Sequence, residues 1–394
     1  MNSKRSVYTA KRLYDGTAVI DDPVVVVEDG LVASISTRAG IPLPTEACAV
    51  DFPDATLAPS FLDIHIHGAA GHDVMEATSE ALAAMGRFLA SRGTGGFLAT
   101  TVTAPLDTTL RALDGLAKLM GQQKYESSAQ MLGIHLEGPF LSNAKRGVQP
   151  AEYLLAPSVA TFDKMIEASE GNVRLMTLAP ELPGAAELTY HATKRGVRVS
   201  LGHSNATAAE TRPAIAAGAV SATHTFNAMR ALDHREPGIL GTVLTDDALF
   251  AELICDGVHS RPEAVRLWWR AKGPKRAILV TDAMSATGMP DGEYELGGFA
   301  VKVVKGCAMK DGVLAGSLLT LDRALENFLT YTWATLDEGL RLLTRNPATL
   351  IGLGGVEGCI AVGQVANLVA VNAEGKLIAS IVNGVAATSS LASF

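Results

Sequence analysis

The chain has 394 residues, of which 48% are hydrophobic and 19% charged, and its formal net charge is −8. These values indicate a globular protein with a large core, expected to form one large domain and a small accessory one. The acidic balance excludes a generic binder of nucleic acid or of anionic membranes, because such proteins gather Lys and Arg on one face. Neither a secretion signal nor a run of roughly 18 apolar residues is visible, so we expect a cytoplasmic protein.

The two ends of the chain share one character. Residues 7–57 are short β-rich pieces broken by Gly and Pro, such as VVVVEDGLVASIS at 24–36. Beyond Asn346-Pro347 the same texture returns and ends in NLVAVNAEGKLIASIVNGVAA at 367–387. We therefore expect segments 1–57 and 351–394 to pair into one small β-sandwich domain.

Residues 58–350 alternate short apolar runs with Ala-, Leu- and Glu-rich helical stretches, such as 79–93 and 206–218, which end at Gly. This alternation predicts an α/β fold of repeated βα units, and eight parallel strands are the number that closes a (β/α)8 barrel. An open doubly wound sheet is the alternative, but it does not gather residues from many strands around one point. The eight expected strands are FLDIHIH (61–67), FLATTVT (97–103), MLGIHLE (131–137), VRLMTLAP (173–180), VRVSLGH (197–203), VSATHT (220–225), FAELICD (250–256) and AILVTD (277–282).

The stretch that follows the eighth strand, at 288–317, is rich in Gly and in two-residue turn signals. It predicts a hairpin insertion near the mouth of the barrel. Helices are expected again over 318–332 and 335–345.

Polar residues stand at the ends of the expected strands, where a barrel places its active site. His65 and His67 are two residues apart on one strand, so both side chains point to the same face and can meet one ion. Glu137 ends the third strand, and its carboxylate is costly to bury without a cation or hydrogen-bond donors. Taken singly, the histidine pair is more often hydrogen-bonded than metal-bound, and Glu137 could cap backbone amides.

Three further polar residues end other strands. His203 ends the fifth, His224 the sixth and Asp282 the eighth. Two imidazoles and one carboxylate with room for water are typical of a catalytic zinc, iron(II), manganese or cobalt site. Asp282 is placed to take a proton from water and to pass it to a leaving amine, although an Asp here could also be a helix N-cap. The coincidence of all these residues at strand ends favours the metal site.

The motifs HIHGAAGHDVM, ATTVTAP, HLEGPF, LGHSNA, THTFNAM, HREPG, CDGVH, TDAMSATGMPDG and LAGS, in this order, resemble the N-acetylglucosamine-6-phosphate deacetylase family of the amidohydrolase superfamily. The resemblance implies a barrel with a two-segment β domain, a homodimer, and hydrolysis of an amino-sugar phosphate in amino-sugar catabolism and cell-wall recycling. It also implies that Glu137, His203 and His224 hold a divalent metal, zinc being the first expectation, and that Asp282 is the catalytic acid and base. His65 and His67 match the ligands of a second ion, so one or two ions per subunit are expected.

The same resemblance implies the residues that contact the substrate. Arg235 matches an arginine that reaches the sugar phosphate across the dimer interface, and an arginine fork suits a phosphate dianion. From its residue type alone, Arg235 is a surface charge on a loop. The other implied substrate positions are Asn227, Ala228, His259, Gln149, and the backbone of Leu314, Ala315 and Gly316.

Gln149 is a departure from the family. The chain reads RGVQ where KGAH is common, so an amide stands where a substrate-contacting histidine is frequent. An amide can donate and accept hydrogen bonds but cannot become cationic. Hydrolysis should survive, but the preferred sugar epimer is open, and N-acetylgalactosamine 6-phosphate is an alternative substrate.

Two other functions remain as alternatives. A hydantoinase-like amidohydrolase is disfavoured, because a bridging modified lysine usually stands where this chain has Glu137. A catalytically inactive barrel used as a scaffold should have lost a ligand or Asp282, and none is missing.

Overall fold

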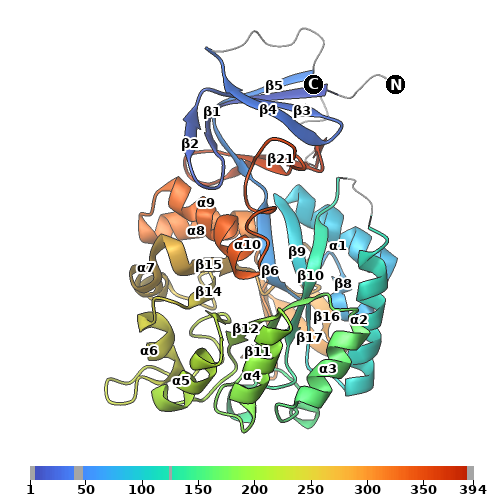
Figure 1. Ribbon diagram of the computed structural model, residues 1–394, viewed down its shortest axis with the longest axis vertical. Helices are drawn as coiled ribbons and strands as arrows, with labels where there is room; N and C mark the ends of the chain where they lie inside the picture. The colour runs from blue at the N-terminus through green and yellow to red at the C-terminus, as the bar shows by residue number, and fades with distance from the viewer. Residues whose placement is uncertain (1–4, 40–47, 124–126, 388–394) are drawn as a thin grey trace.

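The computed structural model describes residues 5–39, 48–123 and 127–387, so the outermost residues of both expected terminal segments lie outside the described residues. Its centre is an eight-stranded parallel sheet in the order β15-β14-β13-β12-β11-β10-β9-β6 (Figure 1). Each strand overlaps one of the eight apolar runs. The strands are β6 (Phe61–Ile66), β9 (Thr94–Thr101), β10 (Gln130–Glu137), β11 (Val173–Leu178), β12 (Arg198–Leu201), β13 (Ser221–Ala222), β14 (Phe250–Ile254) and β15 (Ala277–Val280).

The sheet closes between the last residue of β6 and the segment just beyond β15. Ile66 and Ala283 form a parallel bridge, and the Asp282 amide donates to the His65 carbonyl oxygen at 2.9 Å. Below this bridge the buried Asp63 carboxylate accepts the Thr281 hydroxyl at 2.5 Å, which ties β6 to β15 inside the barrel. The (β/α)8 barrel is confirmed, and the open doubly wound sheet is wrong.

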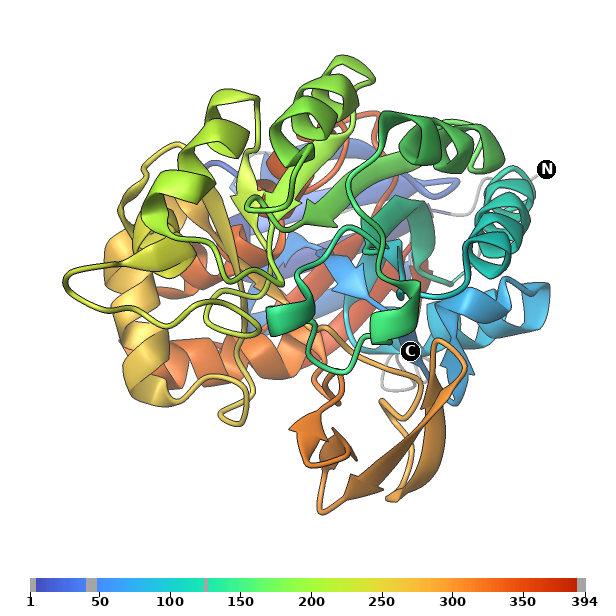
Figure 2. The same ribbon diagram turned by 90° about the horizontal axis from the view of Figure 1, so that it is seen from below.

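Helices surround the barrel (Figure 2). Their ends follow from local chemistry: Thr78 caps the first helix by accepting the Ala81 amide at 3.2 Å, and Gly93, just past the C-cap, adopts φ 83°. The expected helix over 335–345 is divided at Thr344, whose backbone is not helical. The helices are α1 (Ser79–Ser91), α2 (Leu106–Met120), α3 (Val159–Ala168), α4 (Ala185–Lys194), α5 (Ala208–Ala216), α6 (Gly238–Thr245), α7 (Pro262–Arg276), α8 (Leu321–Thr332), α9 (Leu336–Leu343) and α10 (Arg345–Leu350).

A second sheet contains strands from both ends of the chain, as expected. The C-terminal strand β20 pairs antiparallel with β5, with Leu368 opposite Pro59, and strands from both ends share one apolar cluster. Because β6 begins at Phe61, directly after β5, this sheet lies at the amino-terminal end of the barrel (Figure 1). Its strands are β1 (Arg5–Tyr14), β2 (Val19–Asp21), β3 (Pro23–Glu28), β4 (Leu31–Thr37), β5 (Cys48–Pro59), β20 (Leu368–Val371), β21 (Leu377–Val382) and β22 (Val385–Ala386).

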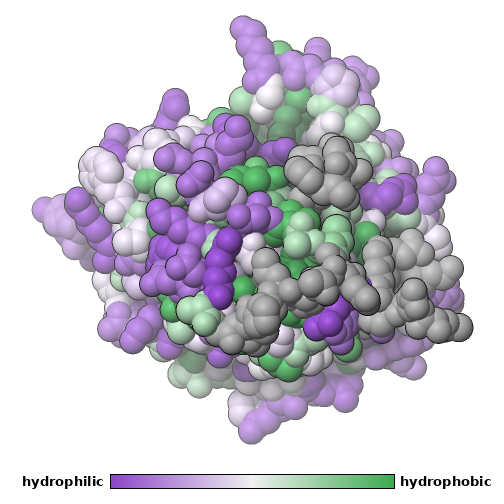
Figure 3. All heavy atoms as spheres, turned by 90° about the horizontal axis from the view of Figure 1, so that it is seen from above, coloured by the Kyte–Doolittle hydropathy of each residue, from purple (hydrophilic) through white to green (hydrophobic). Residues whose placement is uncertain are grey.

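The surface at this end of the molecule is mixed. Seen from above, apolar side chains gather near the middle of the face and hydrophilic ones around its margin (Figure 3). Within the described residues, no helix has the length and apolar character needed to cross a membrane.

The insertion after β15 is larger than the single hairpin expected from the sequence. It is a four-stranded antiparallel sheet of β16 (Gly292–Leu296), β17 (Phe299–Val304), β18 (Cys307–Lys310) and β19 (Val313–Leu314), which projects beside the open end of the barrel (Figure 2). Three two-residue turns connect these strands. Both turn residues have positive φ in every case, which is the geometry of tight hairpins and explains the choice of Gly-Gly, Lys-Gly and Asp-Gly.

Candidate metal and substrate site

Six side chains from five strands converge at the carboxyl ends of the barrel strands. Three of them lie two residues beyond the strand that positions them, and there the backbone turns into the left-handed region: φ is 46° at His203, 30° at His224 and 51° at Asp282. A residue with a Cβ pays about 1–2 kcal/mol for this conformation. Strain of this kind at three converging residues is typical of a functional site.

The first group of potential ligands consists of Glu137, His203 and His224. Glu137 Oε1 lies 3.2 Å from the Nε2 atom of each histidine, and the two Nε2 atoms are 3.1 Å apart. A tetrahedral ion with ligands at 2.0–2.1 Å would separate them by about 3.3 Å. The three atoms therefore fit one divalent ion without rearrangement.

The second group, His65, His67 and Asp282, lies beside the first. Asp282 Oδ1 is 3.1 Å from His67 Nε2 and 3.4 Å from His65 Nε2. Glu137 connects the groups, because its Oε1 is 3.2 Å from His65 Nε2 and its Oε2 is 3.3 Å from His67 Nε2. The arrangement offers places for one ion or for two that share Glu137.

Three of the four histidines have a partner for the ring nitrogen that faces away from the centre, whereas His224 Nδ1 is buried without one among the described residues. His203 Nδ1 meets the Lys145 carbonyl oxygen at 2.9 Å, and His67 Nδ1 meets the Thr100 carbonyl oxygen at 3.1 Å. His65 Nδ1 lies 3.3 Å from the carboxylate of Glu252, which is fully buried in β14. Such partners fix the ring orientation of metal-binding histidines.

The histidine rings lower the pKa values of the two buried carboxyl groups of the site. Burial would raise the pKa of Glu137, but the His65 and His203 rings beside it and hydrogen bonds from His203 and His224 hold that pKa well below its usual range. Burial likewise opposes ionisation of Asp282, but His65 and His67 lower its pKa below the ordinary value. Both carboxyl groups therefore favour the anionic form at neutral pH.

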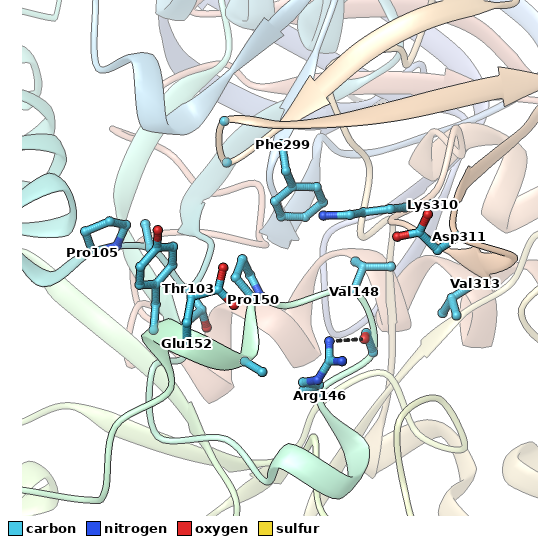
Figure 4. Close-up of a pocket in the computed structure, with 16 residues that line it drawn as sticks. Thr103, Pro105, Arg146, Val148, Pro150, Glu152, Phe299, Lys310, Asp311 and Val313 are labelled. Atoms are coloured by element: carbon cyan, nitrogen blue, oxygen red, sulfur yellow. Dashed lines mark hydrogen bonds between the residues drawn. The ribbon is translucent and has the colours of Figure 1, made fainter.

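A cavity of about 370 Å³ opens over these groups. Its wall includes Asn227, Ala228, His259, Leu314 and Gly316, five positions expected to contact substrate. A larger cavity of about 560 Å³ adjoins it between the loop after β10 and the inserted sheet, and Val148 and Val313 line both cavities. Figure 4 shows this neighbour, with Arg146 facing it from the loop and Lys310 lying over the Phe299 ring.

Comparison with known proteins agrees with this geometry. The amidohydrolase family model matches residues 56–389. The chain is 37% identical over 371 residues to the N-acetylglucosamine-6-phosphate deacetylase of Bacillus subtilis (strain 168), covering 93% of each chain. The chain belongs to the N-acetylglucosamine-6-phosphate deacetylase family of amidohydrolases.

One further relative and one solved structure of this deacetylase family are also similar to the chain. The N-acetylgalactosamine-6-phosphate deacetylase of Escherichia coli O157:H7 is 38% identical over 367 residues, 93% of this chain and 95% of that protein. A solved structure of a mutant N-acetyl-D-glucosamine-6-phosphate deacetylase from Mycobacterium smegmatis, in complex with N-acetyl-D-glucosamine-6-phosphate, has a TM-score of 0.91. It is 32% identical, and the match covers 98% of this chain and all of that one.

The remaining residues that the deacetylase resemblance implied lie in three different settings. Ala315 is buried behind the cavity wall, where its amide donates to the Ala308 carbonyl oxygen at 3.0 Å. Arg235 is exposed on the loop before α6 and does not line the cavity of its own chain. Gln149 lines the cavity, but both ends of its amide are occupied by the protein.

Sequence reasoning missed two carboxylates that orient histidines, Glu252 and Asp256. Asp256 Oδ2 lies 2.7 Å from His259 Nδ1, and its Oδ1 accepts the Val258 and His259 amides. Burial opposes the charging of His259, but Asp256 raises the pKa of its ring. A charged residue inside the apolar run FAELICD was the available signal for Glu252; no spacing rule marks Asp256 as a partner of His259.

His135 has the interior environment expected of a histidine that is not a ligand. Its ring lies inside the barrel between the hydroxyl groups of Thr100 at 3.4 Å and Thr177 at 2.8 Å. Burial lowers the pKa of this ring well below its usual range. His135 is therefore a neutral part of the polar layer beneath the site.

Proposed function

We propose that the chain hydrolyses the acetamide of N-acetylglucosamine 6-phosphate to glucosamine 6-phosphate and acetate. The observation that carries the proposal is the convergence of Glu137, His203 and His224 within 3.1–3.2 Å, beside the Asp282 carboxylate and at the base of a cavity. Membership of a family whose members bear this activity in their names supports the substrate class. A scaffold would have no need to keep the strained ligand residues.

The donor set fits a divalent ion, and we propose zinc, with iron, manganese and cobalt as alternatives that the same ligands accept. Glu137, His203 and His224 would hold one ion, and His65, His67 and Asp282 are the candidates for a second. Such an ion, when bound, acidifies water and polarises a carbonyl group.

The chain's own residues supply the proton transfers and the orientation. Asp282, anionic at neutral pH, accepts the proton of the attacking water and returns it to the nitrogen as the C–N bond breaks. Asn227 Nδ2 is buried without a partner among the described residues and lines the cavity, so it is available to a polar group of the sugar. Asp256 raises the pKa of His259, which favours the cationic ring and suits an anionic group such as the phosphate.

Measuring acetate release from the two N-acetylhexosamine 6-phosphates tests the proposed function and identifies the preferred sugar epimer. The Escherichia coli relative is named for the galactosamine substrate, so N-acetylgalactosamine 6-phosphate is the second candidate. We expect release from the glucosamine epimer to exceed that from the galactosamine epimer, and the unphosphorylated sugars to be poor substrates. Release from neither phosphorylated sugar, with metal supplied, would refute the proposed function.

We also propose a homodimer in which Arg235 reaches the neighbouring active site. Its exposure, and its absence from the wall of its own cavity, support a contact outside the subunit. The cytoplasmic location stays a prediction from the sequence.

Asp256→Asn should weaken phosphate recognition in a pH-dependent way. Loss of the carboxylate lowers the pKa of His259, so a smaller fraction of the ring is cationic at a given pH. We expect KM for the phosphorylated substrate to rise by about tenfold, the equivalent of 1.4 kcal/mol. The rise should be largest on the alkaline side, where the wild-type ring is still charged, while kcat changes less. A KM-against-pH curve identical to that of the wild type would exclude this role for Asp256.

A further inference from the structure

Gln149 spans two fixed partners in the wall of the catalytic cavity. Its Oε1 accepts the backbone amide of Thr103 at 2.8 Å, and its Nε2 donates to Glu137 Oε2 at 2.8 Å. The side chain is buried, with 4% of the residue exposed. The amide orientation is determined chemically, because the Thr103 N–H can only face the oxygen, and the NH2 group must then face Glu137.

The two oxygens of Glu137 consequently have different surroundings. Oε1 lies 3.2 Å from the Nε2 atoms of His65, His203 and His224. Oε2 faces His67 Nε2 at 3.3 Å and receives the Gln149 hydrogen bond. A hydrogen bond to a carboxylate is among the stronger ones in proteins, so it resists rotation of the Glu137 carboxylate.

The loop that carries Gln149 is held by a hydrogen bond within the loop and by a contact with His203. Arg146 Nη1 donates to the Gln149 carbonyl oxygen at 3.1 Å, and Lys145, in the same loop, meets His203 Nδ1 through its carbonyl oxygen. In Figure 4, Arg146 lies on the side that faces the larger cavity, hydrogen-bonded to the Gly147 carbonyl oxygen. The loop thus fixes Gln149 relative to Glu137 and His203 together.

We propose that Gln149 is a positioning residue for the metal site rather than a contact for the sugar. The Gln149 amide holds the Glu137 carboxylate with Oε1 toward His203 and His224. It does so by donating a hydrogen bond to Oε2, the oxygen that faces His67. The group containing His203 and His224 is therefore the tighter ion site, and the group containing His65 and His67 the weaker one. The inference rests on the metal binding that the proposed function requires.

Zinc binding to purified protein tests the role without relying on activity. Zinc is titrated against a chromophoric chelator for the wild type, for Gln149→Met and for Gln122→Met, an exposed control of the same chemistry. We expect Gln149→Met to weaken the tighter site by about 10- to 100-fold, as loss of a partner to a ligand usually does. Gln122→Met should match the wild type.

Kinetics with added metal separate the two possible roles of Gln149. If Gln149 positions Glu137, turnover of Gln149→Met falls at limiting zinc and recovers in excess zinc. Its KM then stays within about twofold of the wild-type value, well under the tenfold change that corresponds to about 1.4 kcal/mol. If it contacts the sugar, KM rises and excess zinc does not restore it, and the proposal is wrong.

Gln149→Glu gives a second, independent readout, which also decides the matter if Gln149→Met does not fold. The substitution keeps an acceptor for the Thr103 amide but places a second carboxylate against Glu137. Two adjacent carboxylates favour an additional cation, so the weaker site should tighten relative to the stronger. A wild type that binds no zinc would contradict the proposed function. A wild type that binds zinc, with both variants unchanged, would contradict the role of Gln149 alone.

Discussion

Asp282→Asn should reduce kcat by about 10²- to 10⁴-fold, the range expected for loss of a general acid and base. The amide is nearly isosteric and keeps an oxygen near His65 and His67, so the barrel and the site formed by Glu137, His203 and His224 should persist. We therefore expect the zinc that this group binds to be retained while turnover is lost. Steady-state kinetics and metal analysis of the same preparation provide the two measurements.

The matched control is Asp54→Asn, which makes the same substitution at an exposed position of the terminal sheet. It should leave both kcat and metal content unchanged. If Asp282→Asn kept kcat within about tenfold of the wild type, Asp282 would fall short of the smallest effect expected of a general base.

Glu137→Ala should have the second large effect, because Glu137 belongs to the first group of ligands and also faces His65 and His67 of the second. Its removal deletes the only carboxylate facing His203 and His224 within the first group and leaves the buried imidazoles without their anionic partner. Loss of a group that is hydrogen-bonded to a metal ligand weakens metal binding by roughly 10- to 100-fold. Loss of Glu137 removes a ligand itself, so we expect the zinc affinity to fall by more than this, and turnover to fall with it.

Equilibrium zinc titration checks this expectation, with Glu187→Ala on the exposed face of α4 as the control. Near-ultraviolet circular dichroism should show that the tertiary structure of the Glu137 variant is kept. Retention of stoichiometric, tightly bound zinc by that variant would show that the ion lies elsewhere.

The barrel could be predicted because its strands are buried on both faces, are mostly apolar and lead into polar residues at their carboxyl ends. A parallel strand buried on both faces reads as a continuous apolar run, and all eight runs became strands. The strand ends were less predictable. His203, His224 and Asp282 were expected at the ends of their strands but lie two residues beyond them. The left-handed turn that directs each side chain into the site leaves no mark in hydrophobic periodicity, so the sequence did not show it.

The contacts that could not be predicted from the sequence join segments that are distant along the chain. Glu252 approaches His65, and Gln149 approaches Glu137, only because the barrel closes and the loop after β10 folds over its mouth. The inserted sheet was expected as one hairpin, although each of its turns carries a local signal. Two of those signals, Lys-Gly and Asp-Gly, lie only a few residues apart and define very short strands.

X-ray diffraction from zinc-loaded crystals, with data collected on both sides of the zinc absorption edge, locates the bound ion. We expect an anomalous difference peak within about 2.0–2.2 Å of Glu137 Oε1 and of the Nε2 atoms of His203 and His224. A zinc peak that touches none of these three atoms, in crystals of protein that releases acetate from N-acetylglucosamine 6-phosphate, would contradict this expectation.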